Sequence, residues 1–270
     1  MTVPPVGPQP SVVLPRLARQ GAGLSAGLRA VPEEAAVALT YGRATHAVMM
    51  ATPADLSDLG LGFSLTEGLI TRPEELTALE VVPRPGGIEL RMELAAPRAA
   101  ALSRRRRHLA GPLGCGLCGI ESLSEAMRDL PALTAATPLP AAEIGAAMSA
   151  LSAAQSLHRE THAVHAAGFW RPGQGLLALR EDVGRHNALD KLAGALLRRG
   201  VAAAAGAVVL TSRVSVEMVQ KTALLGAPLL LAVSAPTALA VRAAEGCGIT
   251  LVALARGEDF EVFTHPDRIV

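Results

Sequence analysis

The sequence contains few aromatic residues and carries little net charge. Four Phe, one Trp and one Tyr occur in 270 residues, and the formal net charge is +1 at pH 7. Proteins that bind nucleic acid strands without sequence preference need a positively charged groove and aromatic side chains for base stacking. The composition therefore excludes a general nucleic-acid-binding protein, and it gives no reason to expect attraction to an anionic membrane.

We expect neither a secretory leader nor an uninterrupted membrane span in this sequence. The first fifteen residues hold five prolines and no basic residue, so we expect residues 1–25 to be a disordered tail rather than a signal peptide. Residues 224–241 are uncharged, but Pro228 and Pro236 interrupt them. A strand followed by a helix is expected there instead of a membrane helix. We therefore expect a cytoplasmic protein with no membrane partner.

Cysteine is scarce, with three residues in the chain. An odd number argues against a disulfide framework. Cys247 stands alone at an apparent helix-to-strand turn, where an inert buried cysteine is expected. Cys115 and Cys118 form a Cys-x-x-Cys pair within LAGPLGCGLCGI, with glycines on both sides. Such a pair can hold a metal, form a redox couple or carry a chemical group.

The first part of the chain has the pattern of a small α+β domain. Residues 35–51 and 79–94 each contain two strand-like segments around a glycine-containing turn, which predicts two hairpins. Thr52 is followed by proline, so a helix is expected to begin there with the Thr52 hydroxyl as its cap. We expect residues 26–130 to form this domain and to end in the Cys-x-x-Cys loop and a short helix at 122–130.

Residues 131–270 show a different pattern, in which short apolar segments alternate with longer amphipathic ones. This alternation predicts an α/β domain built on a mainly parallel, helix-covered sheet. The expected strands span 176–179, 207–210, 228–233 and 249–254, and the expected helices span 187–199, 214–225 and 237–245.

Polar residues follow each of these strands. Ligands of open α/β sheets bind beyond the carboxyl ends of the strands, which makes these residues candidates for ligand binding: Arg185, Thr211, Ser212, Arg213, Ser234 and Arg256. Helix N-termini favour anions and arginine binds phosphate through two hydrogen bonds, so a phosphorylated or nucleotide-like ligand is expected. In the alternative interpretation the hydroxyls cap helices and the arginines form surface ion pairs. No GxGxxG motif follows a predicted strand, where a dinucleotide-binding fingerprint would lie, and GxxxxGK[ST] is absent.

Three chemical roles compete for the cysteine pair. A structural zinc site needs four ligands, and His158, His162 and His165 follow the pair by about forty residues, outside the usual spacing. A zinc deaminase would need its histidine before the cysteines. A thioredoxin-type couple needs a βαβ setting that is absent here. A sulfur carrier needs a mobile thiol of lowered pKa, and the glycines with the arginines at 104–107 fit that need.

Four longer segments of the sequence stand out: LAGPLGCGLCGIESL, REDVGRHNALDKL, SRVSVEMVQK and AVSAPTALAV. Together they resemble the FdhD/NarQ family, the formate dehydrogenase accessory sulfurtransferases. The resemblance extends from about Leu39 to the C-terminus, and the motifs occur in the family's order. The sequence departs from the family pattern at His162, Ser212 and Ala253-Leu254.

The resemblance implies a sulfurtransferase that takes sulfur as a persulfide from a cysteine desulfurase. It would deliver this sulfur to the molybdenum bis(molybdopterin guanine dinucleotide) cofactor before that cofactor enters formate dehydrogenase. By position, Cys115 carries the persulfide and Cys118 is its partner. The resemblance also implies a homodimer and a cytidine-deaminase-like three-layer α/β domain without zinc, joined to a smaller N-terminal α+β domain.

The resemblance further assigns a segment that contacts the cofactor. It comprises Leu254, Ala255, Arg256, Gly257, Glu258 and Asp259. His165 matches a further histidine of the family, and a histidine of the core is the alternative. Two other functions stay open for the whole chain: a non-catalytic chaperone for the same cofactor, and a thiol-disulfide oxidoreductase.

Overall fold

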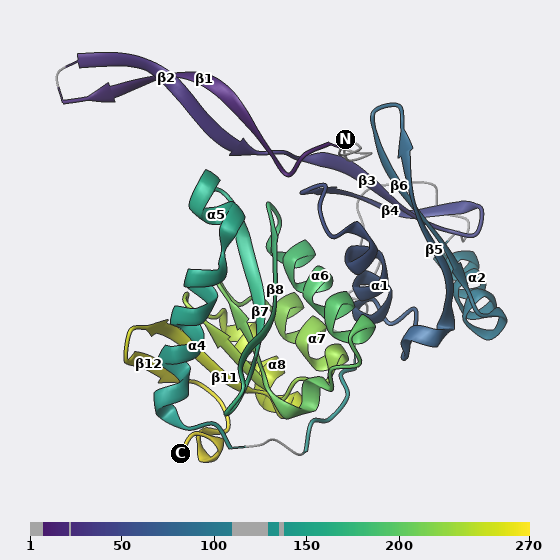
Figure 1. The fold of residues 1–270 in the computed structure, drawn as a ribbon. Helices are drawn as coiled ribbons and strands as arrows, with labels where there is room; N and C mark the ends of the chain where they lie inside the picture. The colour runs from purple at the N-terminus through teal and green to yellow at the C-terminus, as the bar shows by residue number, and fades with distance from the viewer. Residues whose placement is uncertain (1–7, 22, 110–128, 135–137) are drawn as a thin grey trace.

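The computed structural model describes residues 8–21, 23–109, 129–134 and 138–270 (Figure 1). Its strands are β1 (Ser11–Gln20), β2 (Gly23–Pro32), β3 (Ala35–Tyr41), β4 (Ala44–Ala51), β5 (Leu76–Arg84), β6 (Gly87–Leu94), β7 (His165–Arg171), β8 (Gly175–Asp182), β9 (Ala207–Leu210), β10 (Leu229–Ala232), β11 (Thr250–Arg256) and β12 (Asp259–Val262). Its helices are α1 (Leu56–Thr66), α2 (Ala96–Leu109), α4 (Ala141–Ala154), α5 (Ser156–Thr161), α6 (Arg185–Arg198), α7 (Val216–Leu225) and α8 (Ala238–Cys247). Cys115, Cys118 and most of the helix expected at 122–130 lie outside the described residues.

The larger sheet has six strands in the order β12-β11-β10-β9-β7-β8. β9, β10 and β11 are parallel, as expected, but β7 is antiparallel to both β8 and β9. The prediction of a mainly parallel sheet is therefore corrected to a mixed one. The sequence does not reveal β7 because its five central residues are all buried, so the strand shows no alternation of polar and apolar side chains.

Helices cover both faces of this sheet (Figure 1). Along β9, Ala207 and Val209 pack in a core with residues of α4, whereas Val208 and Leu210 pack in a core with residues of α6, α7 and α8. A strand that serves two cores is apolar throughout, which explains its continuous hydrophobic sequence. The helices expected at 187–199, 214–225 and 237–245 are confirmed as α6, α7 and α8.

The smaller sheet has four strands in the order β4-β3-β6-β5. Both predicted hairpins, β3–β4 and β5–β6, are present, and β3 joins them by parallel pairing with β6. α1 packs on this sheet through Leu59 and Phe63. The predicted cap is wrong, because Asp55 is the N-cap residue of α1 and no side chain caps the helix. The Thr52 hydroxyl instead accepts a hydrogen bond from the backbone N of Val183 at 3.1 Å.

The N-terminal hairpin corrects the prediction of a disordered tail over 1–25. β1 and β2 pair along ten residues each and extend away from the rest of the molecule (Figure 1). Pro15 is tolerated because both strands of a two-stranded sheet are edge strands. The hairpin contacts α5, where Ser11 Oγ donates to Glu160 Oε1 at 2.8 Å and Arg29 Nη2 donates to the carbonyl of Thr161 at 3.2 Å.

The backbones of α1 and α6 are in direct contact. A Cβ atom on Gly62 would overlap the carbonyl of Asp190, and one on Gly194 would overlap the carbonyl of Asp58. We call residues 35–109, which surround the smaller sheet, the N-terminal unit, and residues 139–270, which surround the larger sheet, the C-terminal unit. The two glycines allow these units to pack closely against each other.

The uncharged segment 224–241 is not a membrane span. It forms the end of α7, the strand β10 and the start of α8, as predicted. Across the described ranges, no helix has both the length and the hydrophobicity to cross a membrane.

We predict that Gly194→Ala lowers the free energy of unfolding by about 3 kcal/mol, because the added methyl group collides with backbone atoms that cannot rotate away. The matched control is Gly246→Ala in α8, where no atom lies within 4 Å of the added Cβ. There, alanine is expected to be neutral or to stabilise the helix by up to about 1 kcal/mol. Chemical denaturation of both variants measures the difference. Equal stabilities would contradict the contact between α1 and α6.

Candidate functional site

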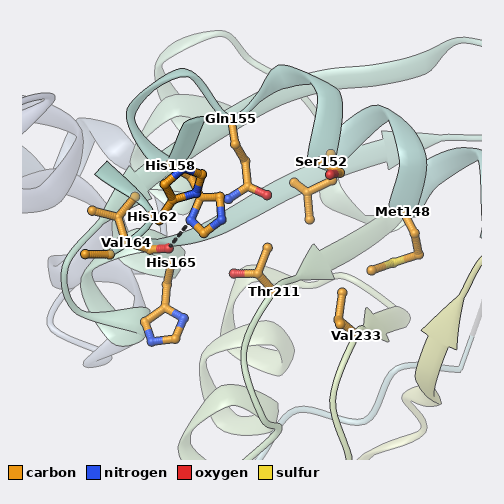
Figure 2. Close-up of a pocket in the computed structure, with 11 residues that line it drawn as sticks. Met148, Ser152, Gln155, His158, His162, Val164, His165, Thr211 and Val233 are labelled. Carbon is orange, nitrogen blue, oxygen red and sulfur yellow. Dashed lines mark hydrogen bonds between the residues drawn. The ribbon is translucent and has the colours of Figure 1, made fainter. Parts of the chain in front are cut away.

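A cavity of about 550 Å³ lies at the edge of the six-stranded sheet where β9 and β10 end and the antiparallel β7 begins (Figure 2). Its lining comes from α4, α5 and these strand ends: Met148, Leu151, Ser152, Gln155, His158, His162, Ala163, Val164, His165, Thr211 and Val233. Two predicted site residues therefore line the same cavity: Thr211, predicted from a strand end, and His165, which the family resemblance implies.

The α5 wall of the cavity is fixed by Glu181 of β8. One oxygen of this carboxylate accepts a hydrogen bond from the backbone N of Leu157 at 2.9 Å, and the other accepts from the backbone N of His158 at 2.8 Å. The first N–H groups of a helix have no partner within the helix, and an acidic group satisfies them well. β8 therefore holds this short helix beside the cavity.

Three histidines line the cavity. The rings of His158 and His162 are 5.6 Å apart and nearly perpendicular, and His158 Nδ1 lies 3.2 Å from the carbonyl of Val164 (Figure 2). Burial lowers the pKa of His165, and the charges of Arg185 and His158 lower it further. His165 is consequently neutral at pH 7 and forms hydrogen bonds as an uncharged ring.

Arg185, the first residue of α6, lies close to this site. Its charge lowers the pKa of both His165 and His186. Its Nε atom is buried and has no hydrogen-bond partner among the described residues. Gly184, the N-cap residue of α6, offers no side-chain cap. A free guanidinium donor beside a helix N-terminus favours an anionic group.

The hydroxyls after β9 are engaged within the protein. Thr211 Oγ1 accepts from the backbone N of Ala166 at 2.9 Å, and Ser212 Oγ donates to the carbonyl of Arg213 at 3.1 Å. These bonds support the alternative interpretation, in which such hydroxyls stabilise the local backbone, although Thr211 also lines the cavity. The Arg213 side chain is exposed, and Ser234 directly follows the cavity residue Val233.

The segment 254–259 adjoins the cavity without lining it. Leu254 has a left-handed φ of 55°, and the pairing of β11 with β12 shifts between Ala253 and Arg256. The turn after β11 rests on α4, because a side chain at Gly145 would collide with the carbonyl of Gly257. Met148, one helical turn further along α4, lines the cavity. Left-handed backbone at a leucine is strained and often marks a functional segment.

Cys247 has the properties of an inert cysteine. Its side chain is buried, burial raises the pKa of its thiol, and its Sγ donates to the carbonyl of Ala244 at 3.7 Å. Thiolate chemistry is disfavoured in such a place. Cys115 and Cys118 lie outside the described residues, and α2, which ends at Leu109, is the described element that precedes them.

Sequence patterns do not assign Met148, Ser152 or Gln155 to a site, and they present His158 and His162 as candidate zinc ligands. The lining residues of α4 and its C-terminal end follow the spacing 148, 151, 152 and 155. This spacing places them on one face of a helix. The mixture of polar and apolar side chains on that face is the signal that points to a cavity rather than a core.

A search against protein families gives a match to the FdhD/NarQ family over residues 32–270. The chain belongs to the FdhD/NarQ family. A protein of Agrobacterium fabrum named sulfur carrier protein FdhD is 60% identical over 245 residues, which cover 90% of each chain. A protein of Brucella abortus with the same name is 54% identical over 255 residues, covering 94% of this chain and 95% of that one.

A solved structure is also similar to this FdhD/NarQ chain. It is the crystal structure of a protein from Desulfotalea psychrophila described as a formate dehydrogenase accessory protein. The TM-score is 0.75 at 28% identity, with 96% of this chain and 99% of that chain covered. The family resemblance expected from the four sequence motifs is thus confirmed.

His186 provides a pH-dependent test of the α6 N-terminus. Burial and the charges of Arg185 and Lys221 lower its pKa to about 4, while Glu217 and Glu67 oppose this shift. A histidine with a lowered pKa in the folded state binds its proton more readily when unfolded. Its stabilising contribution is therefore complete above about pH 6.5 and falls as the pH decreases toward 4.

We predict that an NMR titration of the His186 ring has its midpoint near pH 4, and that unfolding in denaturant returns the midpoint to about 6.5. The spectrum of His186→Gln assigns the resonance. The same variant should lose less stability than the wild type when the pH is lowered from 6.5 to 4. A midpoint near 6.5 in the folded protein would contradict the described environment of this ring.

Proposed function

We propose that this chain is a sulfur carrier that serves formate dehydrogenase. The observation that carries this proposal is 60% identity, over 90% of each chain, to a protein named sulfur carrier protein FdhD. The Cys115–Cys118 pair supplies thiols suited to that role. The likeness to a structure described as a formate dehydrogenase accessory protein supports formate dehydrogenase as the partner.

In the proposed reaction, the Cys115 thiolate attacks the terminal sulfur of a persulfide on a cysteine desulfurase. A new S–S bond forms at Cys115, the S–S bond of the desulfurase breaks, and the desulfurase thiolate leaves. Positive charge lowers the pKa of a nearby thiol, and Arg104 and Arg105 lie on α2 upstream of the pair. Cys118 either stabilises the persulfide or resolves it. Resolution forms the Cys115–Cys118 disulfide and releases hydrosulfide, and a thiol reductant then restores both thiols.

The proposed acceptor of the sulfur is the molybdenum bis(molybdopterin guanine dinucleotide) cofactor, bound as cargo. It presents uncharged heterocyclic rings and phosphates. The cavity offers amide, hydroxyl and imidazole groups, and Arg185 beside it offers a buried donor without a described partner. This combination supports a nucleotide-bearing ligand. The other proposed contacts of the same cargo are residues 254–259, His165, Thr211, Ser212, Arg213 and Ser234.

Two finer features belong to this proposal. The three layers of the C-terminal unit, with α4 on one face and α6, α7 and α8 on the other, support a cytidine-deaminase-like domain. We propose that this domain works without zinc and that the protein acts in the cytoplasm.

The deciding experiment is intact-protein mass spectrometry after incubation with a cysteine desulfurase and free cysteine. We predict that the wild type gains one sulfur atom and that Cys115→Ala does not. Cys118→Ala should gain the sulfur atom but lose it at a different rate from the wild type. The gain is removed by a thiol reductant, as expected of a persulfide.

The alternatives are separate outcomes of that experiment. No sulfur gain in the wild type, with GDP binding intact, would favour a non-catalytic cofactor chaperone. A reversible Cys115–Cys118 disulfide with a defined potential and no sulfur gain would favour a thiol-disulfide oxidoreductase.

The proposed homodimer has a candidate surface on the β1–β2 hairpin. The strand register places Val13, Leu17, Leu24 and Leu28 on one face of this hairpin, and each is at least 58% exposed. A two-stranded hairpin is marginally stable alone. Arg16 points to the other side, whereas Arg19 lies on this face opposite Leu24, at the end nearer the β1–β2 connection. Neither strand contains an acidic residue, so two copies can pair through the apolar side chains of this face.

We predict that Leu28→Glu converts the dimer to a monomer, because the carboxylate would be buried against the second copy. The matched control is Leu14→Glu, on the opposite face of β1 and 47% exposed. Light scattering over a range of concentrations measures the mass. A monomeric wild type, or equal effects of both variants, would contradict this interface.

A further inference from the structure

The turn between β8 and α6 leads into the first two residues of α6, Arg185 and His186, and Arg185 lies close to the candidate site. Gly184, its N-cap residue, provides no side chain to hold the first turn of α6. The position of Arg185 therefore depends on contacts that reach the turn from elsewhere in the fold. Those contacts converge on one buried carboxylate and one threonine.

The carboxylate is Asp182, the last residue of β8, whose side chain is fully buried. Its Oδ1 accepts from the backbone N of Gly184 at 2.8 Å and from Asn187 Nδ2 at 3.0 Å. Its Oδ2 accepts from Lys191 Nζ at 2.6 Å and from the backbone N of Thr52 at 3.0 Å. Four donors thus orient this side chain, and three of them belong to the turn or to α6.

The threonine is Thr52, which belongs to the N-terminal unit and is fully buried. Its hydroxyl accepts from the backbone N of Val183 at 3.1 Å, inside the turn. Its carbonyl accepts from Lys191 Nζ at 2.8 Å. Two residues earlier, the carbonyl of Met50 accepts from Asn187 Nδ2 at 2.8 Å. The N-terminal unit therefore bonds directly to Val183 in the turn and to Asn187 in α6. It also bonds to Asp182, which in turn accepts from Gly184.

The two units do not need these bonds to remain together. α1 and α6 are already joined at Gly62 and Gly194. Asp58 forms ion pairs with Arg180 and Arg198 at 2.6 and 3.0 Å. These contacts lie along α1, beyond the turn, and none of them involves residues 183–187. The hydroxyl of Thr52 is available for a local task.

We propose that Thr52 is a positioning residue for the turn that precedes Arg185 and His186. Through its hydroxyl, the position of this turn depends on the N-terminal unit, whose helix α2 precedes the cysteine pair in the sequence. The proposal rests on the proposed function, because it takes Arg185 to bind the nucleotide end of the cargo. Without the hydroxyl, the half-buried N–H of Val183 loses its acceptor, and the turn moves to find another. Small displacements of a binding group weaken binding strongly.

The test compares Thr52→Val, Thr52→Ser and the control Thr222→Val, with GDP as the probe. Thr222 is also fully buried, and its hydroxyl donates to the carbonyl of Met218 within α7 at 2.7 Å, away from the turn. Calorimetry measures the affinity for GDP, and denaturation measures stability. Sulfur loading of Cys115 is followed by mass spectrometry.

Thr52→Val is expected to weaken GDP binding about tenfold, the effect of a loss near 1.4 kcal/mol. Thr52→Ser restores the hydroxyl and should stay within about twofold of the wild type. Thr222→Val should lose stability to a similar extent and bind GDP normally. Cys115 should load sulfur in all three variants, because the first step does not use the turn.

Two results would overturn the proposal. One is normal GDP binding by Thr52→Val, and the other is an equal loss of binding in Thr222→Val, which would reflect stability alone. If the wild type does not bind GDP, the proposed cargo site is wrong, and the role of Thr52 is then judged by hydrogen exchange. Faster exchange of the amides of residues 183–187 in Thr52→Val, but not in Thr52→Ser, would support positioning, and unchanged exchange would exclude it.

Discussion

The contact between the backbones of α1 and α6 is the constraint on which the rest of the structure depends. Because Gly62 and Gly194 have no side chains, each helix approaches the carbonyl groups of the other. This approach brings the polar groups of Asp58, Asp190 and Lys191 within reach of partners on the opposite unit. With larger residues at the two glycines these groups would be separated from their partners by about one side-chain layer.

Buried ion pairs of the C-terminal unit border this interface, and their lysines also donate across it, Lys191 to Thr52 and Lys221 to Thr66. Lys191 is paired with Asp182 at 2.6 Å, and Lys221 with Asp190 at 2.9 Å. Burial lowers the pKa of Lys191. At Lys221 burial also acts to lower the pKa, but the negative charges of Asp190 and Glu67 outweigh it and raise the pKa. Removing one member of such a pair leaves an uncompensated charge in the interior. These pairs thus fix the angle and register of α6, and with them the site of Arg185.

Local sequence patterns predicted the parts of the fold that short-range physics determines. The two hairpins of the smaller sheet, the helices α6, α7 and α8, and the inert Cys247 follow from turn residues, periodicity and burial. The strand ends also pointed to the edge of the sheet at which the described cavity lies, and Thr211 lines it. Long-range pairing has no such local signal, and the antiparallel β7 and the hairpin β1–β2 were therefore missed. Pro15 made β1 resemble a tail.

The same limit applies to polar side chains at and near the candidate site. Thr52 precedes a proline at the start of a helix, which is the local pattern of a cap, but its hydroxyl bonds to Val183, far along the chain. Thr211 and Ser212 have the pattern of ligand-binding hydroxyls, yet Ala166 and Arg213 occupy them. In each case a sequence pattern identified a polar group that must be satisfied, but only the tertiary structure shows which partner satisfies it.

The rigid interface limits how sulfur can be delivered. A carrier could bring a thiol to its cargo by rotating one domain against the other, as hinged proteins do. Here such a rotation would break the ion pairs of Asp58 and the bonds of Thr52 to the turn, and it would separate helices whose backbones touch. The cost of exposing these buried groups disfavours a hinge between the two units. Under the proposed function, transfer of sulfur from Cys115 to cargo in the cavity would therefore proceed without opening this interface, and the turn before α6 would keep the same position while sulfur is received and while it is transferred.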